Sequence, residues 1–489
     1  MVEEYNADNS GRSYPVLAWR TPSGITFGLS NGLHFRYDVL TNRITPVEGL
    51  SERKLRSDDH DIGPTRDLGE ISYGFPLTKC LEMADGSMES LTLETTQQCN
   101  CRCKYCLYSG AYDNRRTHSD HVMGARTITA ALRFYRRHNR NCRAAQISFY
   151  GGESLLAFST IRNAVTEATG LFADKPLSFN VSTNGLLLES DVVKWIADNP
   201  NVSVAVTVNG PRHDDYRVTR DGKPTLDGIL RNVMAIRERF PTVWERQINF
   251  ICNIASLSEI RRLRDFYRDV IGKTPIVITG IQLSHAGEPL TKLFKRGDPA
   301  RLRLWYDLAN EYMRTGDLFL HALYRGRIRH IYRRPIYHGT EPAIAANCIP
   351  FISNCFVATN GSINLCEKNC EMILGDVQRG IDIPKVRKLL ENAREVFNRK
   401  CRSCWAQRLC NICFADMENL LLENADILER RCLIERENIA ADMAIFTEFA
   451  LFHAELFDRL YAGEGHSERG SRPMCEPEIT EDLFGECHE

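Results

Sequence analysis

The stretch Leu93-Glu-Thr-Thr-Gln-Gln-Cys99-Asn-Cys-Arg-Cys103-Lys-Tyr105-Cys106 decides the fold of this chain. Three of its cysteines, Cys99, Cys103 and Cys106, are spaced C-x3-C-x2-C. A cubane iron–sulfur cluster normally takes four thiolates, so three closely spaced ones leave one iron open for a substrate or cofactor. A strand-like segment over residues 91–95 leads into this loop, which suits a site at the C-terminal end of a barrel or sheet strand.

Length and composition describe an ordinary globular chain that is rich in cysteine. Its 489 residues, 43% apolar and 26% charged, allow two or three domains. The net charge of −1, the lack of a long apolar run and the absence of an N-terminal signal segment predict no nucleic-acid or membrane partner. Eighteen cysteines without an export signal indicate a cytoplasmic protein with metal or cluster ligation rather than disulfides.

Short β-like runs alternate with amphipathic helical patterns from residue 91 to about residue 290. Repeated βα units with buried parallel strands predict a barrel or an open α/β sheet. The predicted strands are residues 91–95, 146–150, 178–182, 202–208, 247–253 and 276–283, and predicted helices include 125–139, 159–172 and 229–240. Residues 25–47 alternate apolar and polar side chains and predict a small β-rich module, while 300–334 and 433–462 predict helices.

The cysteine spacing, with aromatic Tyr105 before the last cysteine, resembles the radical S-adenosylmethionine (SAM) superfamily. The resemblance implies a partial (β/α)6 barrel. It also implies a [4Fe–4S] cluster on Cys99, Cys103 and Cys106, whose open iron holds SAM and whose electron cleaves SAM to a 5′-deoxyadenosyl radical. The alternative for these thiols is a structural zinc site or a disulfide cluster. Cys101 falls where the family has no ligand, so we leave it out of the set.

Further strand ends carry the same resemblance and imply the residues that handle SAM. They resemble the family's Gly-Gly-Glu-Pro motif and its Asp-Gly-Pro…His-Asp…Arg motif, with Ser154 in place of the proline and Asn209 in place of the common aspartate. Loss of that aspartate puts a charged role at position 209 in doubt. The implied cofactor-binding residues are Tyr105, Gly151, Gly152, Glu153, Ser182, Asn184, Asn209 and Arg217, with Arg217 as a partner for the SAM carboxylate.

The C-terminal cysteines resemble the SPASM domain, which carries two auxiliary [4Fe–4S] clusters and would bring the total to three. Cluster one would take Cys348, Cys355, Cys366 and Cys413, and cluster two would take Cys401, Cys404, Cys410 and Cys432. The last gap before Cys413 is one residue shorter than usual, which could shift that assignment. Cys370 is an alternative ligand for cluster one, and structural zinc is the alternative for both sets.

Five parts follow: a β-rich module over 1–88, which could bind a leader peptide; the α/β barrel over 89–300; a helical linker over 301–345; the SPASM domain over 346–435; and a helix and tail over 436–489. The resemblance to maturases of ribosomally made peptides implies an oxidoreductase that joins residues of a precursor peptide, with a thioether favoured. Flavodoxin or ferredoxin would supply electrons. Glu367, beside a predicted ligand, could accept a proton.

Other functions remain open at this point. The same two domains would also suit an anaerobic sulfatase-type maturase that makes formylglycine, or a maturase that forms carbon–carbon or carbon–oxygen cross-links. A non-catalytic peptide-binding protein would not need the intact C-x3-C-x2-C and Gly-Gly-Glu motifs. A protein for electron transfer alone would not need a SAM site.

Overall fold

A computed structural model describes residues 18–48, 81, 84–110, 115–281, 299–336, 351, 354–413 and 425–461. Contacts divide the chain into two compact units. Unit one comprises Met1–Gly74, Arg296–Ala346 and Ala393–Glu489, and unit two comprises Phe75–Lys295 and Asn347–Asn392. The five predicted domain ranges stay predictions.

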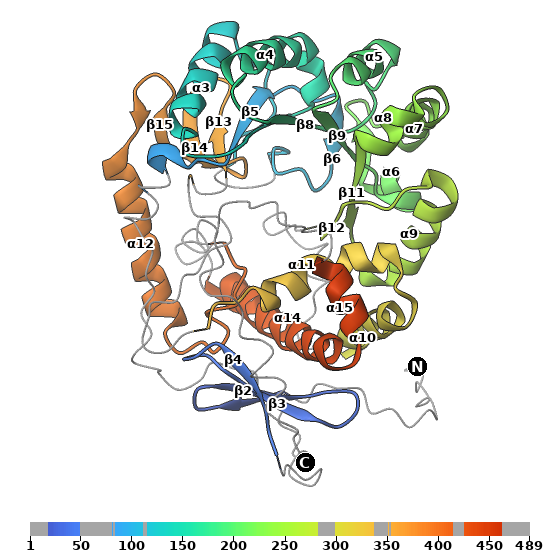
Figure 1. The fold of residues 1–489 in the computed structure, drawn as a ribbon, viewed down its shortest axis with the longest axis vertical. Coiled ribbons are helices and arrows are strands. Elements are labelled where there is room, and N and C mark those ends of the chain that lie inside the picture. Colours follow the sequence, from blue (N-terminus) through green and yellow to red (C-terminus); the bar gives the residue numbers. More distant parts are fainter. Residues whose placement is uncertain are drawn as a thin grey trace. The chain divides into compact units, whose positions relative to one another are not determined.

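Unit two contains six parallel strands, in the order in which the βα pattern predicted them (Figure 1). They are β5 (Ser90–Thr96), β7 (Ala145–Gly151), β8 (Leu177–Thr183), β9 (Val202–Thr207), β11 (Ile248–Ile254) and β12 (Val277–Gly280). Helices on the outer side of this sheet include α3 (Ala125–His138), α4 (Phe158–Leu171), α5 (Ser190–Asp198), α7 (Leu226–Arg239), α8 (Pro241–Arg246) and α9 (Ile260–Phe266). The predicted α/β fold with parallel strands is confirmed for this part of the chain.

The two faces of the sheet differ in polarity because side chains alternate along each strand. On β7, Ile147 and Phe149 are fully buried, whereas the alternate residues Ser148 and Tyr150 are half-buried. The apolar face meets helices such as α3, whose buried residues Ile128, Ala131, Leu132 and Tyr135 recur at helical spacing. A polar inner face is therefore available for a ligand.

The sheet continues where the sequence predicted a separate cysteine-rich domain. Strand β13 (Cys355–Val357) pairs in parallel with β5, and β14 (Ser362–Cys366), β15 (Asn369–Asp376) and β16 (Gly380–Ile381) follow as antiparallel neighbours. Helix α12 (Ile383–Cys401) comes next. The extension went unpredicted because parallel pairing between strands more than 250 residues apart has no local sequence signal.

Short elements at the ends of the strands shape the loops of unit two. Strands β6 (Cys101–Cys103) and β10 (Arg217–Thr219) form a two-stranded antiparallel sheet. Single turns follow the longer strands: η1 (Ser154–Ala157), η2 (Gly210–Arg212), α6 (His213–Tyr216), η3 (Leu257–Glu259) and η4 (Tyr267–Ile271). The β6–β10 pair brings residues that are over a hundred positions apart to the same end of the sheet.

Unit one contains a four-stranded antiparallel sheet and a helical group. The sheet consists of β1 (Trp19–Thr21), β2 (Gly24–Gly28), β3 (His34–Asp38) and β4 (Arg43–Pro46). A separate N-terminal module that binds a leader peptide stays a prediction. The helices are α10 (Pro299–Thr315), α11 (Leu318–Tyr332), α14 (Ala425–Phe452) and α15 (Ala454–Tyr461). None of the helices described is long and apolar enough to cross a membrane.

The helices predicted over 300–334 and 433–462 are each divided into two helices in the structure. The first breaks where Gly316 takes a φ of 63° and Asp317 caps α11, with its carboxylate accepting from Leu320 N–H at 2.9 Å. The second begins at residue 425 and breaks at His453. Residues 439–450 of α14 are buried on every side, so this part of the helix has no exposed polar face.

Candidate active site

The cluster loop lies at the C-terminal end of β5, as predicted. Its central part, Cys101–Cys103, is held by the pairing of β6 with β10, in which Cys103 lies opposite Arg217. Cys106 follows in a turn, with its N–H donating to the carbonyl of Cys103 at 3.0 Å. A short strand pair therefore fixes the three predicted ligands, Cys99, Cys103 and Cys106, in one loop.

The environment of these thiols fits a ligand set for a cationic iron–sulfur centre. A hydrogen bond with Cys101 lowers the pKa of Cys99, while burial raises the pKa of Cys103 and raises that of Cys106 to about 11. Cys99 raises the pKa of Cys103, and both raise the pKa of Cys106, so bound iron would favour the deprotonated thiolates. Among the described residues, no three Cys, His, Asp or Glu side chains already stand in metal-binding geometry.

The paired glycines after β7 pack against the cluster loop itself. A Cβ on Gly151 would lie 2.1 Å from the carbonyl oxygen of Thr96, and one on Gly152 would lie 1.9 Å from that of Gln98. The backbone uses this closeness: Gly152 N–H donates to Thr96 O at 2.9 Å and Glu153 N–H to Gln98 O at 2.7 Å. These glycines therefore set the position of the residues just before Cys99.

The carboxylate of Glu153, predicted to meet the SAM amine, joins two neighbouring strand ends. It accepts hydrogen bonds from Thr183 Oγ1 at 2.7 Å, from Asn184 N–H at 2.7 Å and from Leu155 N–H at 3.1 Å. Glu153 is 1% exposed, and this burial raises the pKa of its carboxyl group. Glu153 therefore orders the segment after β8, and contact with SAM stays a prediction.

The Ser182–Asn184 segment places one predicted residue beside the cluster loop. Asn184 Nδ2 donates to Asn100 Oδ1 at 2.7 Å and to Cys101 Sγ at 3.3 Å. Ser182 lies half-buried on the polar face of β8. Thr183, which the sequence reading did not select, is the residue that contacts Glu153, because it points to the opposite side of the strand.

Tyr105, Asn209 and Arg217, three predicted SAM-handling residues, meet at the phenol oxygen of Tyr105. Arg217 Nη1 donates to it at 2.8 Å, Asn209 Nδ2 at 2.9 Å and Asn253 Nδ2 at 3.4 Å. Asn209 also accepts from Asn253 N–H at 3.1 Å, so an amide that both donates and accepts suits this position. Asn253, the last polar residue of β11, was not selected from the sequence because no glycine turn follows it.

Arg217 brings a buried positive charge to the cluster loop. Arg217 is 7% exposed, and its positive charge lowers the pKa values of Cys99 and Cys103. Its Nε is buried without a hydrogen-bond partner among the described residues. A buried N–H without a partner favours binding of an anionic group here, which suits the predicted contact with a carboxylate.

Cys355, predicted as a ligand of cluster one, faces the apolar core in this structure. On β13 it pairs with Leu91, and it shares the sheet face of Leu91 and Leu93, both fully buried. Burial raises its pKa to about 12. The next residue, Phe356, pairs with Asn364 of β14 on the opposite, polar face. The assignment of Cys355 to cluster one stays a prediction.

The other members of cluster one come from different parts of the chain. Cys366 ends β14 in unit two, Cys413 belongs to unit one, and Cys348 lies outside the described residues. The side chain of Cys370 is likewise not described. The ligand set of cluster one therefore stays a prediction.

The four thiols assigned to cluster two all belong to unit one and influence one another. Cys401 ends α12, Cys404 and Cys410 lie in the following turns, and Cys432 lies on α14. Burial raises the pKa of Cys404, of Cys410 and of Cys432, the last to about 11. Cys404 raises the pKa of both Cys410 and Cys432, as expected for neighbouring thiols.

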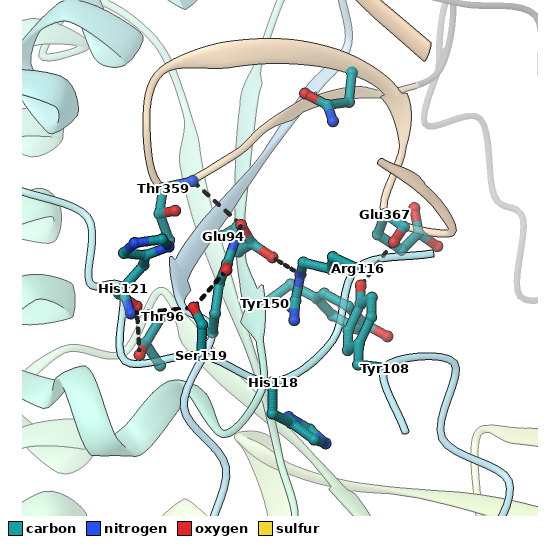
Figure 2. A network of polar contacts seen from close by, with 12 residues as sticks. Glu94, Thr96, Tyr108, Arg116, His118, Ser119, His121, Tyr150, Thr359 and Glu367 are labelled. Carbon is teal, nitrogen blue, oxygen red and sulfur yellow. Dashed lines mark hydrogen bonds and ion pairs between the residues drawn. The ribbon is translucent and has the colours of Figure 1, made fainter. Parts of the chain in front are cut away.

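Glu367, the proposed proton acceptor, lies in the turn between β14 and β15. Its backbone carbonyl accepts from the hydroxyl of Tyr108 at 2.6 Å, which links this turn to the loop after Cys106 (Figure 2). A second carboxylate, Glu94, lies within the sheet and pairs with Arg116 at 2.5 Å. Sequence reading missed Glu94, although a single charged residue in a strand that is otherwise uncharged is a recognisable signal.

Comparison with known proteins agrees with this geometry. The family model described as the Radical SAM superfamily matches residues 93–250. Residues 93–250 therefore form a radical SAM domain.

Particular relatives share part of this domain. The chain is 26% identical over 152 residues to a cysteine-type anaerobic sulfatase-maturating enzyme of Clostridium novyi (strain NT), covering 30% of this chain and 40% of that protein. It is 29% identical over 156 residues to an uncharacterized protein of Methanocaldococcus jannaschii, covering 32% of this chain and 50% of that protein. The chain thus matches half or less of the length of these curated relatives.

Solved structures share the fold over a longer stretch. The structure of histidine-tagged anSMEcpe with bound AdoMet superposes with a TM-score of 0.53 at 16% identity, covering 76% of this chain and 95% of that one. The structure of native anSMEcpe with bound AdoMet and the Cp18Cys peptide gives 0.52 at 16% identity, with 76% and 99% covered. At this identity the likeness shows the fold.

Proposed function

We propose that this chain is a radical SAM enzyme that installs a cross-link, with a thioether favoured, in a ribosomally made precursor peptide. The observation that carries the proposal is the cluster loop, which places Cys99, Cys103 and Cys106 at the end of β5 beside Arg217 and the polar face of the sheet. With a cluster and SAM bound, these cofactors would supply abstraction of a hydrogen atom from the peptide.

The residues of the chain itself would position the reactants. The hydrogen bonds of Tyr105 with Arg217 and Asn209 hold that ring next to the last ligand of the cluster. The buried guanidinium of Arg217 would bind the carboxylate of SAM, and the Gly151-Gly152-Glu153 turn would keep the cluster loop in place. The polar inner face, with Ser148, Tyr150 and Asn180 half-buried, would receive a peptide.

A peptide substrate is supported by the relatives. The neighbour of similar fold was solved with a peptide, and a sequence relative bears the name of a sulfatase-maturating enzyme. Formylglycine formation, or another type of cross-link, is the alternative within the same chemistry. Two auxiliary clusters would carry the spare electron, and flavodoxin or ferredoxin would serve as reductant.

The test combines metal analysis with SAM cleavage under strictly anaerobic conditions. We expect about twelve irons per reconstituted chain, and about eight in a triple Cys99/Cys103/Cys106→Ala variant, since a cubane cluster holds four. Strong reduction should make the wild type cleave SAM and the triple variant should not. A wild type that is loaded with iron and never cleaves SAM would overturn the proposal, and zinc in place of the auxiliary iron would remove the auxiliary clusters from it.

A further inference from the structure

A cavity of about 310 Å³ opens on the polar face of unit two, where β5 meets β13. Its lining includes Glu94, Arg116, Phe356 and Asn364. The volume is close to that of ten water molecules and suits a group the size of an amino-acid side chain. Val122 and Ile373, which are 47% and 42% exposed, give the cavity an apolar rim. A ligand with an apolar stem and a polar head would match this lining.

Glu94 is the buried charge of this cavity, at 1% exposure, and it is nearly saturated (Figure 2). One oxygen forms the ion pair with Arg116. The other accepts from Gln97 Nε2 at 2.9 Å and from Thr359 N–H at 3.2 Å. A carboxylate offers about four acceptor positions, so one remains for a ligand donor.

Arg116 supplies the positive charge and hydrogen-bond donors of this cavity. Its guanidinium lies 3.5 Å from the ring centre of Tyr108, its Nε faces Glu94, and its Nη1 donates to Thr117 O at 3.2 Å. The remaining Nη2 is buried and has no hydrogen-bond partner among the residues that the structure describes. Such a buried donor destabilises the fold unless a ligand acceptor satisfies it.

We propose that this cavity binds the side-chain carboxamide of an asparagine or glutamine residue in the peptide substrate. The carbonyl oxygen would accept from Nη2 of Arg116, and the amide N–H2 would donate to the remaining acceptor position of Glu94. That the carboxamide belongs to a peptide rests on the proposed function. The binding chemistry itself rests on the cavity.

The ion pair explains why an amide is selected over an acid of the same shape. Glu94 already neutralises Arg116, so a second carboxylate would meet the negative charge of Glu94 without a compensating cation. A carboxylate ligand would also lack an N–H group to donate to the remaining acceptor position of Glu94. An asparagine or glutamine side chain supplies both an acceptor and a donor without net charge.

The test uses two small probes, N-acetylglutamine methylamide and N-acetylglutamate methylamide, and the full chain reconstituted without oxygen. Their binding is compared by ligand-observed NMR at about pH 7, where the glutamate probe is ionised. We expect the glutamine probe to bind the wild type at least tenfold more tightly than the glutamate probe. Arg116→Met should weaken binding of the glutamine probe at least tenfold, and Glu94→Gln should reverse the preference toward glutamate. Arg126→Met, which alters an exposed arginine on α3, should behave as wild type.

Reversal of the preference in Glu94→Gln is a readout that mere loss of folding cannot produce. Should Arg116→Met not fold, Arg116→Lys keeps the charge and should still weaken the glutamine probe, because it lacks the fork of donors. Equal binding of both probes by the wild type, no binding of either, or an unchanged preference in Glu94→Gln overturns the proposal. A wild type that cleaves SAM but does not bind the glutamine probe refutes the cavity proposal alone. A wild type that binds the glutamine probe but does not cleave SAM refutes the proposed function alone.

Discussion

Single residues in this chain change role when their partners are known. Glu153 lies in a motif that implies contact with SAM, yet its carboxylate accepts three hydrogen bonds from the chain. Cys355 lies at ligand-like spacing, yet its thiol faces the core. In both cases the residue type suggests a chemical role and the fold supplies structural contacts, and both assignments stay predictions.

The first residue-scale prediction concerns iron content. Cys355→Ala should keep the full iron complement and lose about 1 kcal/mol of stability, because it removes one buried sulfur from a packed core. Cys366→Ala should lose about four irons if it holds a cluster. Metal analysis of both reconstituted variants checks this, and an equal loss from Cys355→Ala would return that residue to the ligand set.

His213 gives a pH-dependent prediction. It is fully buried, its Nδ1 accepts from Asn209 N–H at 3.0 Å, and burial next to Arg217 lowers its pKa to about 3. The unfolded chain therefore binds a proton below about pH 6.5 that the folded chain does not, so stability falls as the pH falls. From about pH 7 to about pH 5 this group should remove about 2 kcal/mol.

The matched variant for this prediction is His213→Gln, which keeps an acceptor for Asn209 N–H and does not titrate. Chemical unfolding of both proteins at the two ends of this pH interval gives the difference in slope. We expect the variant to lose about 2 kcal/mol less than the wild type over this interval. Identical losses would mean that His213 is protonated in the folded chain.

At the scale of elements, the ends of the parallel strands build the site. The turn after β7 packs on the residues that precede Cys99, and β10 pairs with the cluster loop through β6. These contacts involve backbone atoms, so they tolerate many side chains but no added Cβ at the two glycines. The position of the cluster loop therefore depends on its neighbours as well as on its own sequence.

Gly152→Ala tests this dependence. The added Cβ would lie 1.9 Å from Gln98 O, so the turn or the cluster loop must move, at a cost of about 3 kcal/mol. We expect lower stability and less iron at Cys99, Cys103 and Cys106, measured by unfolding and by metal analysis. Gly170→Ala is the control: the position lies in α4 with nothing near its Cβ, and the change should stabilise the chain by about 0.5–1 kcal/mol. Similar behaviour of the two variants would contradict the role of the turn.

At the scale of the whole molecule, the chain forms two compact units that carry different predicted metal sites. Cys99, Cys103 and Cys106 belong to unit two, and Cys401, Cys404, Cys410 and Cys432 belong to unit one. Each unit is assembled from segments far apart in the sequence. A change at one of these sites should therefore leave the other site intact.

Cys404→Ala checks this separation. The variant should lose about four irons and keep the electron paramagnetic resonance signal of the reduced SAM-binding cluster, because that cluster lies in unit two. The signal should still change on addition of SAM. Zinc in place of the lost iron would identify a structural site in unit one, and loss of the SAM-dependent signal would contradict the independence of the two sites.

The sequence by itself determined the order of the βα units and the position of the cluster loop. These features have local signals: alternation along strands, helical spacing of apolar residues, glycine turns and cysteine spacing. Strands β5, β7, β8 and β11 lie within two residues of their predicted bounds, and Tyr105, Asn209 and Arg217, chosen separately, meet at one hydroxyl.

Only the tertiary structure decided which residues share a surface. The pairing of β13 with β5 extends the sheet, turns Cys355 into the core and creates the cavity beside Glu94 and Arg116. Nothing in the sequence near either strand specifies that pairing, because parallel strands are joined by long connections and their register follows from packing of the whole sheet. Local pattern fixes where an element begins and which residues it offers, and long-range packing fixes what those residues contact.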